Sequence, residues 1–398
     1  MLLDRFLEYV KIDTQSDDFS TTTPSTKKQF NLLNLLKKQL DELGVKNELT
    51  KTGRLYGFIP GNEDLVAIGV NAHVDTAPDF TGTNVQPNVI KNYDGKTIIL
   101  GKSGRFLDPK EYPVLQKLVG KTLITTNGET LLGADDKAGV SIIMEVIKEV
   151  LKLKQVERHP MYILFTPDEE VGRGAEELDT NKFKAKFAYT FDGNYPTSIN
   201  VETFNAAGAE VTIIGKAIHT GYAKGILINA GAIGVEFVSM LPKDTVPEKT
   251  SGREGFNHLD DFHGNTEKCT MHFMLRNHDL KKLEAQKKLF EKITSELQAK
   301  YPGAKIELKI KDSYRNMVEV INKNPECKEH IEKVYKKLGY ELNYELVRGG
   351  TDGATFSFKG CPTPNLGTGS YNHHGPYEFA CLEQMEQLVR IGVEIFKK

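Results

Sequence analysis

The sequence predicts an α/β fold with a mostly parallel sheet, into which a smaller α+β domain is inserted. Three observations support this prediction. Helical and strand patterns alternate over residues 1–200, and from about residue 206 the order changes to strand, helix, two strands, helix and strand. The length of 398 residues also exceeds what a single core usually holds. Alternating helices and strands are typical of a parallel sheet covered by helices on both faces. The order of elements from about residue 206 is that of a split βαβ unit.

The elements of the first region follow from hydrophobic periodicity. Residues 27–43 carry apolar side chains at helical spacing, including Leu33, Leu36 and Leu40. Short apolar runs predict strands, and a longer periodic run predicts a further helix. In chain order they are a strand at 65–72, a helix at 138–153, and strands at 161–165 and 185–193.

The inserted region has its own elements, and the chain then returns to the first pattern. "GAEVTIIG" reads as a strand, 225–241 as a helix, "GFNHLDDFHG" and "KCTMHFMLRN" as strands, 279–300 as a long helix and "AKIELKIKDS" as a strand. Helices are expected again at 324–338 and 381–397. We therefore expect one discontinuous domain, 1–205 with 313–398, and a second domain at 206–312.

Charge and composition exclude several classes of protein. Lys and Arg number 52 against 54 Asp and Glu, which disfavours a nucleic-acid-binding or polybasic membrane surface. No apolar run reaches the roughly 18–20 residues of a membrane span, and the acidic, helix-patterned beginning is unlike a secretion signal. The four cysteines are scattered without a C-x-x-C pair, which favours free thiols in a reducing, cytoplasmic compartment.

Acidic and histidine side chains follow several of the predicted strands. They occur in "HVDTAPD", "GADDKAG", "TPDEEVG", "TFDG" and "YNHHGPYEF". His73 and Asp75 are two residues apart, so in an extended chain both point to one face. Because parallel strands end at one edge of a sheet, these segments are expected to meet there. Imidazole and carboxylate ligands without thiolates suit a hydrolytic zinc or related divalent site. Cations would also neutralise the three adjacent acids Asp168, Glu169 and Glu170.

Each segment by itself has a plainer interpretation. His73 and Asp75 suit a hydrogen-bonded pair at a strand end, and Asp135–Asp136 suits the acidic start of a helix. A run of three acids is usually a solvated loop, and Asp192 followed by glycine is an ordinary turn. The joint occurrence of all five acid- or histidine-bearing segments at the ends of predicted elements favours the metal site.

Six segments resemble the peptidase T family, cytosolic tripeptidases within the aminoacylase and carboxypeptidase superfamily of two-zinc hydrolases. They are "HVDTAPD", "LLGADDKAG", "FTPDEEVGRGA", "TFDG", "RGGTDGATFS" and "YNHHGPYEF". The resemblance spans nearly the whole chain. It implies a two-zinc exopeptidase domain with an inserted lid that also mediates dimerisation.

The resemblance implies a role for each residue of the metal site. His73 and Asp192 would bind one zinc, Glu170 and His374 the other, and Asp135 would bridge both, followed by Asp136 across a cis peptide. His374 is preferred to its neighbour because the family has a glutamate four residues after the ligand, which Glu378 matches. The implied cofactors are two Zn²⁺ per chain, with cobalt or manganese as substitutes.

The resemblance also implies the catalytic and substrate-binding residues. Glu169 corresponds to the general base, and Asp75 to the acid that orients His73. His219 corresponds to the lid histidine that stabilises the oxyanion, often across the dimer. The family commonly reads His-Pro-Gly there, whereas this chain has Thr220 in the middle. Arg276, Arg348 and Asn229 correspond to residues that contact the substrate, although a structural ion pair is the plainer role for either arginine.

The expected function is therefore removal of the N-terminal residue from unblocked tripeptides by a metal-activated water. The expected partners are a short peptide and a second copy of the chain, with no nucleic acid and no membrane. A dipeptidase, an aminoacylase or another two-zinc amidohydrolase is one alternative. A catalytically silent, metal-stabilised binding protein is another, and acids that are merely solvated and bind no metal are a third.

Overall fold

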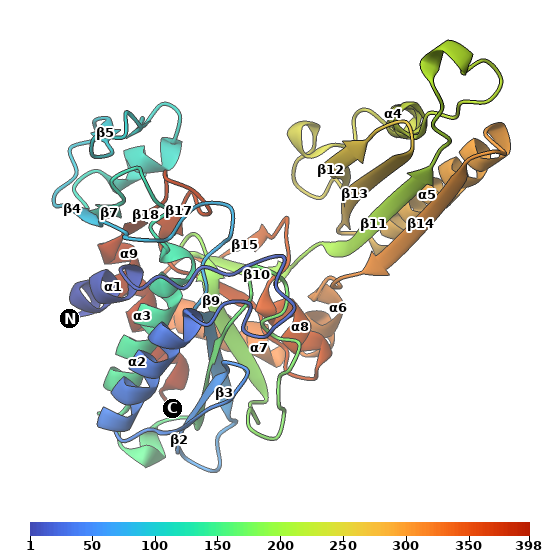
Figure 1. The fold of residues 1–398 in the computed structure, drawn as a ribbon. Coiled ribbons are helices and arrows are strands. Elements are labelled where there is room, and N and C mark those ends of the chain that lie inside the picture. The colour runs from blue at the N-terminus through green and yellow to red at the C-terminus, as the bar shows by residue number, and fades with distance from the viewer. The chain divides into compact units, whose positions relative to one another are not determined.

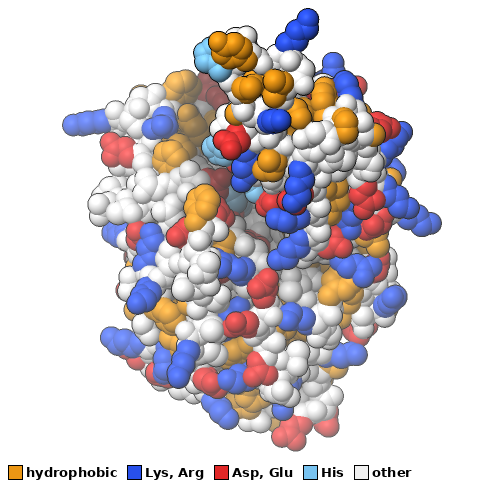
Figure 2. Space-filling model, turned by 45° about the vertical axis from the view of Figure 1, so that its right-hand side comes forward, with side chains coloured by type: hydrophobic (Ala, Val, Ile, Leu, Met, Phe, Trp, Pro, Cys, Tyr) orange, Lys and Arg blue, Asp and Glu red, His pale blue; other side chains and the backbone are white.

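The computed structural model describes residues 1–398 and divides into two compact units (Figure 1). Unit 1 comprises Met1–Val201, Met317–Glu345 and Thr351–Lys398. Unit 2 comprises Glu202–Asn316 and Leu346–Gly350. No helix has both the length and the apolar character needed to cross a membrane. Acidic and basic side chains are interspersed over the face shown in Figure 2, in keeping with the net charge of −2.

Unit 1 is built on an eight-stranded sheet in the order β1-β2-β8-β3-β9-β16-β10-β15. Its centre is parallel, because β3 pairs in parallel with β8 and β9, and β16 with β9. Antiparallel pairs flank this centre, β1 with β2, β2 with β8, and β10 with β16. The strands are β1 Lys46–Leu49, β2 Leu55–Ile59, β3 Ile68–His73, β8 Met161–Thr166, β9 Phe187–Gly193, β10 Ser198–Glu202, β15 Asn343–Leu346 and β16 Asn365–Gly367.

Side chains alternate between two cores on opposite faces of this sheet. In β8, Ile163 and Phe165 join the larger core, whereas Leu164 joins a smaller one with Phe183 and Phe356. Most helices of unit 1 contribute to the larger core, while α8 brings Phe356 to the smaller. The helices are α1 Leu2–Val10, α2 Gln29–Glu42, α3 Ala134–Val150, α6 Val318–Lys323, α7 Glu326–Leu338, α8 Asp352–Phe358 and α9 Leu382–Phe396. Helices on both faces are what the alternating pattern predicted.

A second, small sheet of unit 1 was not predicted. Its order is β17-β18-β7-β4, and a separate pair, β5 with β6, lies in the same part of the chain. The strands are β4 Asn88–Ile90, β5 Ile98–Ile99, β6 Phe106–Leu107, β7 Leu123–Thr125, β17 Ser370–Tyr371 and β18 Phe379–Cys381. Strands of two or three residues are too short to show the alternation of apolar and polar side chains. They form because they pair with strands that are distant in sequence.

Unit 2 is a four-stranded antiparallel sheet in the order β12-β13-β11-β14. Helices α4 and α5 contact each other and the sheet, and they cover one of its faces (Figure 1). The elements are β11 Asn205–Ile214, α4 Ala230–Met240, β12 Phe256–Gly264, β13 Lys268–Asn277, α5 Leu280–Lys300 and β14 Lys305–Asp312. Their order along the chain is β-α-β-β-α-β, as expected. Helix α4 begins later than the expected residue 225 because the Asn229 side chain caps it, accepting a hydrogen bond from Ala232 N.

Candidate active site

The polar segments meet at the carboxyl ends of the central strands of unit 1. His73 is the last residue of β3, Glu169 and Glu170 follow β8, and Asp192 is the penultimate residue of β9. Asp135 lies in the first turn of α3, where the backbone is not helical and the peptide bond to Asp136 is cis, as the resemblance implied. The loop between β17 and β18 supplies the two adjacent histidines. The sheet topology thus brings together segments far apart in sequence.

Two groups of potential metal ligands share Asp135. The first group is His73, Asp135 and Asp192, and the second is Asp135, Glu170 and His374; within each group the ligand atoms lie within 4.8 Å of one another. Each oxygen of the Asp135 carboxylate faces a histidine of a different group. Its Oδ1 is 2.9 Å from His73 Nε2, and its Oδ2 is 3.4 Å from His374 Nε2. The two groups are candidate sites for two cations, and Asp135 is common to both.

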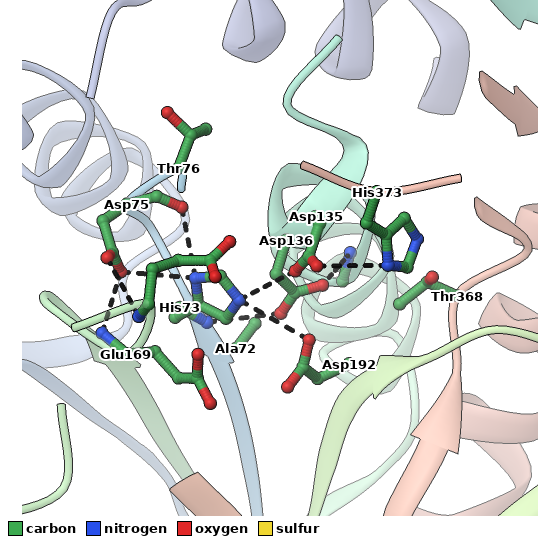
Figure 3. Close-up of polar contacts among 12 residues, drawn as sticks. Ala72, His73, Asp75, Thr76, Asp135, Asp136, Glu169, Asp192, Thr368 and His373 are labelled. Carbon is green, nitrogen blue, oxygen red and sulfur yellow. Dashed lines mark hydrogen bonds and ion pairs between the residues drawn. The ribbon is translucent and has the colours of Figure 1, made fainter. Parts of the chain in front are cut away.

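The His73 imidazole is held between acids on both sides (Figure 3). Its Nδ1 is 3.1 Å from the Asp75 carbonyl oxygen and 3.3 Å from Asp75 Oδ1. Its Nε2 faces Asp135 and, at 3.5 Å, Asp192 Oδ1. Burial works in the opposite direction, but the contacts with Asp135, Asp192 and Asp75 raise the pKa of His73 well above its usual value. The ring thus contacts Asp75 through Nδ1 while its Nε2 faces the ligand group.

The acidic triplet after β8 divides into three environments. Asp168 is buried and has a positive φ of 56°, with its carboxylate bonded to Ser25 and Gln29. Glu170 Oε2 is 3.0 Å from His374 Nε2, within the second ligand group. Glu169 belongs to neither ligand group, although its backbone N–H donates to Asp75 Oδ1 at 3.1 Å. Three adjacent acids thus have three different surroundings.

The electrostatics of the site fit divalent cations. Burial, reinforced by the charge of Asp135, raises the pKa of Glu170 to about 7. Burial and the neighbouring acids likewise raise the pKa of Glu169 and of Asp192. Glu170 Oε1 is buried without a hydrogen-bond partner. Crowded carboxylates and an unpartnered buried oxygen are costly alone and become favourable beside a cation, so these residues fit a two-metal centre.

Both histidines of the "NHHG" segment approach Asp135, but their other contacts differ. His373 Nδ1 is 3.1 Å from Asp135 Oδ2, and its Nε2 is hydrogen-bonded to Ser370 at 2.8 Å. His374 contacts both Asp135 and Glu170, and its Nδ1 lies 3.6 Å from Asp79. His374 is therefore the one that completes the second ligand group.

The remaining residues expected at the site lie in unit 2. His219 Nδ1 accepts a hydrogen bond from Gly221 N at 3.0 Å, so in the neutral ring the proton is on Nε2. Asn229 is engaged as the cap of α4. Arg276 Nη1 donates to the carbonyls of Ala207 and Leu275.

Arg348 is held within unit 2 by several contacts. Its guanidinium donates to the carbonyls of Gly252 and Glu254 and to Thr250 Oγ1, each at 2.8 Å, and it stacks on Phe204 and Phe256. These contacts give Arg348 a structural role in unit 2. Binding of a substrate carboxylate remains a prediction for both arginines.

Two further acids, Glu378 and Asp136, accept hydrogen bonds from backbone N–H groups around the site. Glu378 accepts hydrogen bonds from the backbone N–H groups of Leu132 and Gly133 at 2.7 Å and of Asp135 at 2.9 Å. Asp136 accepts from His73 N at 3.2 Å and from Gly139 N at 3.1 Å. Buried acids that bind backbone N–H groups leave no pattern in a single sequence.

Comparisons with known proteins show which family, relatives and folds this chain resembles. The family model described as Peptidase family M20/M25/M40 matches residues 128–398. Peptidase T of Staphylococcus carnosus (strain TM300) is 45% identical over 98% of this chain and 96% of its own length. Peptidase T of Staphylococcus aureus (strain JH9) is 46% identical over 99% of this chain and 97% of its own length. A solved tripeptidase from Staphylococcus aureus covers 100% of this chain and 97% of its own with a TM-score of 0.75 at 23% identity, which shows the same fold.

Proposed function

Because the chain belongs to peptidase family M20/M25/M40, we propose that it is a tripeptide aminopeptidase that removes the N-terminal residue from unblocked tripeptides. The observation that carries this proposal is the pair of ligand groups sharing Asp135, with Glu169 beside them and outside both. Relatives named Peptidase T, similar over almost their whole length, support the choice of substrate.

His73, Asp135 and Asp192 would hold one metal ion, and Asp135, Glu170 and His374 the other. Bound there, divalent ions would supply a Lewis acid for the scissile carbonyl and an acidified water. We propose zinc because the ligands are imidazoles and carboxylates, with cobalt or manganese as substitutes.

Glu169 is the proposed general base. It accepts a proton from the water that attacks the scissile carbonyl, and it returns that proton to the nitrogen of the leaving amine as the C–N bond breaks. Burial raises the pKa of its carboxyl well above the usual value, which makes the carboxylate a stronger proton acceptor. Asp75 keeps the His73 ring in place throughout.

Residues of unit 2 complete the proposal. His219, whose Nε2 carries the proton when Nδ1 accepts from Gly221, is the proposed donor to the developing oxyanion. Arg276 and Arg348 are proposed to bind the C-terminal carboxylate of the peptide, and Asn229 to contact the substrate. We further propose a homodimer formed through unit 2, a cytoplasmic location, and no nucleic-acid or membrane partner.

A panel of substrates tests the function. Free tripeptides are compared with C-terminally amidated tripeptides, dipeptides, tetrapeptides and N-acyl amino acids. We expect free tripeptides to be cleaved fastest, because two residues beyond the scissile bond, each roughly 3.3–3.6 Å long, would measure the distance to a carboxylate-binding arginine. Equal cleavage of free and amidated tripeptides contradicts the carboxylate contact. Preference for dipeptides or N-acyl amino acids favours the amidohydrolase alternative, and no hydrolysis of any substrate favours the binding protein.

A further inference from the structure

Asp168 is the acid of the triplet that faces away from the ligand groups. We propose that it is a positioning residue, which fixes the turn carrying Glu169 through the N-terminal segment that contains Ser25 and Gln29. The proposal rests on the proposed function, because it concerns the orientation of Glu169, the proposed general base. It assigns a task in catalysis to a segment about 140 residues distant in sequence.

Asp168 is hydrogen-bonded to Ser25 and Gln29 through its carboxylate and its backbone N–H. Ser25 N donates to Asp168 Oδ1 at 2.9 Å and to Oδ2 at 2.7 Å, and Gln29 Nε2 donates to Oδ1 at 2.7 Å. In return, Asp168 N donates to Gln29 Oε1 at 3.2 Å. Asp168 and Gln29 are both completely buried, so these bonds do not compete with solvent. The side chain of Gln29 therefore binds both the carboxylate and the backbone of Asp168.

The backbone of the turn shows why this anchor matters. Asp168 has a φ of 56°, in the left-handed region, which reverses the chain immediately before Glu169. At the far end of the turn, Arg173 Nη1 donates to Ser20 O at 2.9 Å, a second tie to the N-terminal segment. From the other side, Asp75 accepts from the N–H groups of Glu169 and Glu170. The turn is thus held between Asp75 and the N-terminal segment.

The pair allows an exchange of side chains that keeps a donor facing an acceptor between positions 29 and 168, while Ser25 N keeps one of its two oxygen acceptors. Asp168→Asn alone directs an amide NH₂ either at the NH₂ of Gln29 or, with the asparagine amide turned over, at Ser25 N. Turning the Gln29 amide over only moves the conflict to the backbone N–H of position 168. Gln29→Glu alone buries two facing carboxylates. In the double variant, the amide oxygen introduced at position 168 can accept from Ser25 N, while the amide NH₂ and the backbone N–H of that position donate to a carboxylate at position 29. Asparagine also tolerates positive φ, so the backbone remains unstrained.

The experiment measures kcat, KM and melting temperature for both single variants and the double variant, with free tripeptide and saturating zinc at 25 °C. We expect kcat of each folded single variant to fall at least tenfold with KM within twofold, and the double variant to regain at least a third of the original kcat. Asp41→Asn is the matched control, since Asp41 is an exposed acid at the end of α2, the helix that begins with Gln29. It should leave kcat unchanged.

Each outcome decides the question. Single variants that melt at lower temperature but keep normal kcat at 25 °C would show that Asp168 only stabilises the fold. A folded double variant with kcat still tenfold low would also overturn the proposal. If a single variant does not fold, the double variant decides alone, and its failure to fold counts against the proposal. Absence of tripeptide hydrolysis in the unmodified protein would instead refute the proposed function.

Discussion

The carboxylate of Asp75 accepts a hydrogen bond from the backbone N–H of Glu169 at 3.1 Å, while its Oδ1 lies 3.3 Å from His73 Nδ1. One completely buried side chain thus connects a ligand group with the proposed general base. A substitution at this position is therefore expected to disturb both.

Asp75→Asn tests this connection. The amide carries only one oxygen, so its NH₂ faces either the His73 ring and Glu169 N, which both contact Oδ1, or Glu170 N, which contacts Oδ2. We expect activity or metal affinity to fall roughly 10- to 100-fold, the usual effect of losing a partner that orients a metal-binding histidine. Steady-state kinetics and metal titration measure the two effects. Unchanged values in both would contradict the orienting role.

Glu169 and Glu170 are predicted to differ although both are glutamates in one turn. Glu169→Gln should reduce kcat by about 10²- to 10⁴-fold and leave two metal ions bound, because its carboxylate is outside both ligand groups. Glu170→Gln should also lower the metal content, because Glu170 belongs to the second group. Elemental analysis beside kinetics separates them. Near-normal turnover of Glu169→Gln would show that another group is the base.

Metal removal is the third test. Five ligand residues in two groups predict two divalent ions per chain. Chelation should abolish hydrolysis, and zinc or cobalt should restore it. The bound ions should also raise the melting temperature by binding the folded state alone. Full activity in a preparation that elemental analysis shows to be free of metal would contradict this prediction.

His330 predicts a pH dependence of stability. Burial lowers the pKa of His330, whose Nε2 donates to Ile395 O at 2.9 Å in the neutral form. The unfolded chain then binds more protons than the folded one, so the free energy of unfolding falls as pH decreases from about 6.5 through the lowered pKa. His330→Gln, which can still donate to the carbonyl, should lose less melting temperature between pH 7 and pH 5 than the unmodified protein. Equal losses would assign the acid sensitivity to other groups.

Sequence patterns predicted the long elements because these have clear periods. Helix α5 (Leu280–Lys300) and strand β8 (Met161–Thr166) both lie where the sequence indicated. The sheet at β4, β7, β17 and β18 was missed, since its strands have only two or three residues. That sheet matters, because the loop between β17 and β18 carries His374.

The sequence by itself determined the types of ligand and the ends of strands at which they occur. It did so because the two-residue period of a strand and the order of elements are local properties. Only the tertiary structure decided which acid has which surroundings. Asp168, Glu169 and Glu170 are chemically alike and adjacent, but Gln29 binds the carboxylate of Asp168 and His374 contacts that of Glu170, while Glu169 lies outside both ligand groups. Gln29 and His374 come from distant segments, and hydrogen bonding and burial between such segments are properties of the fold.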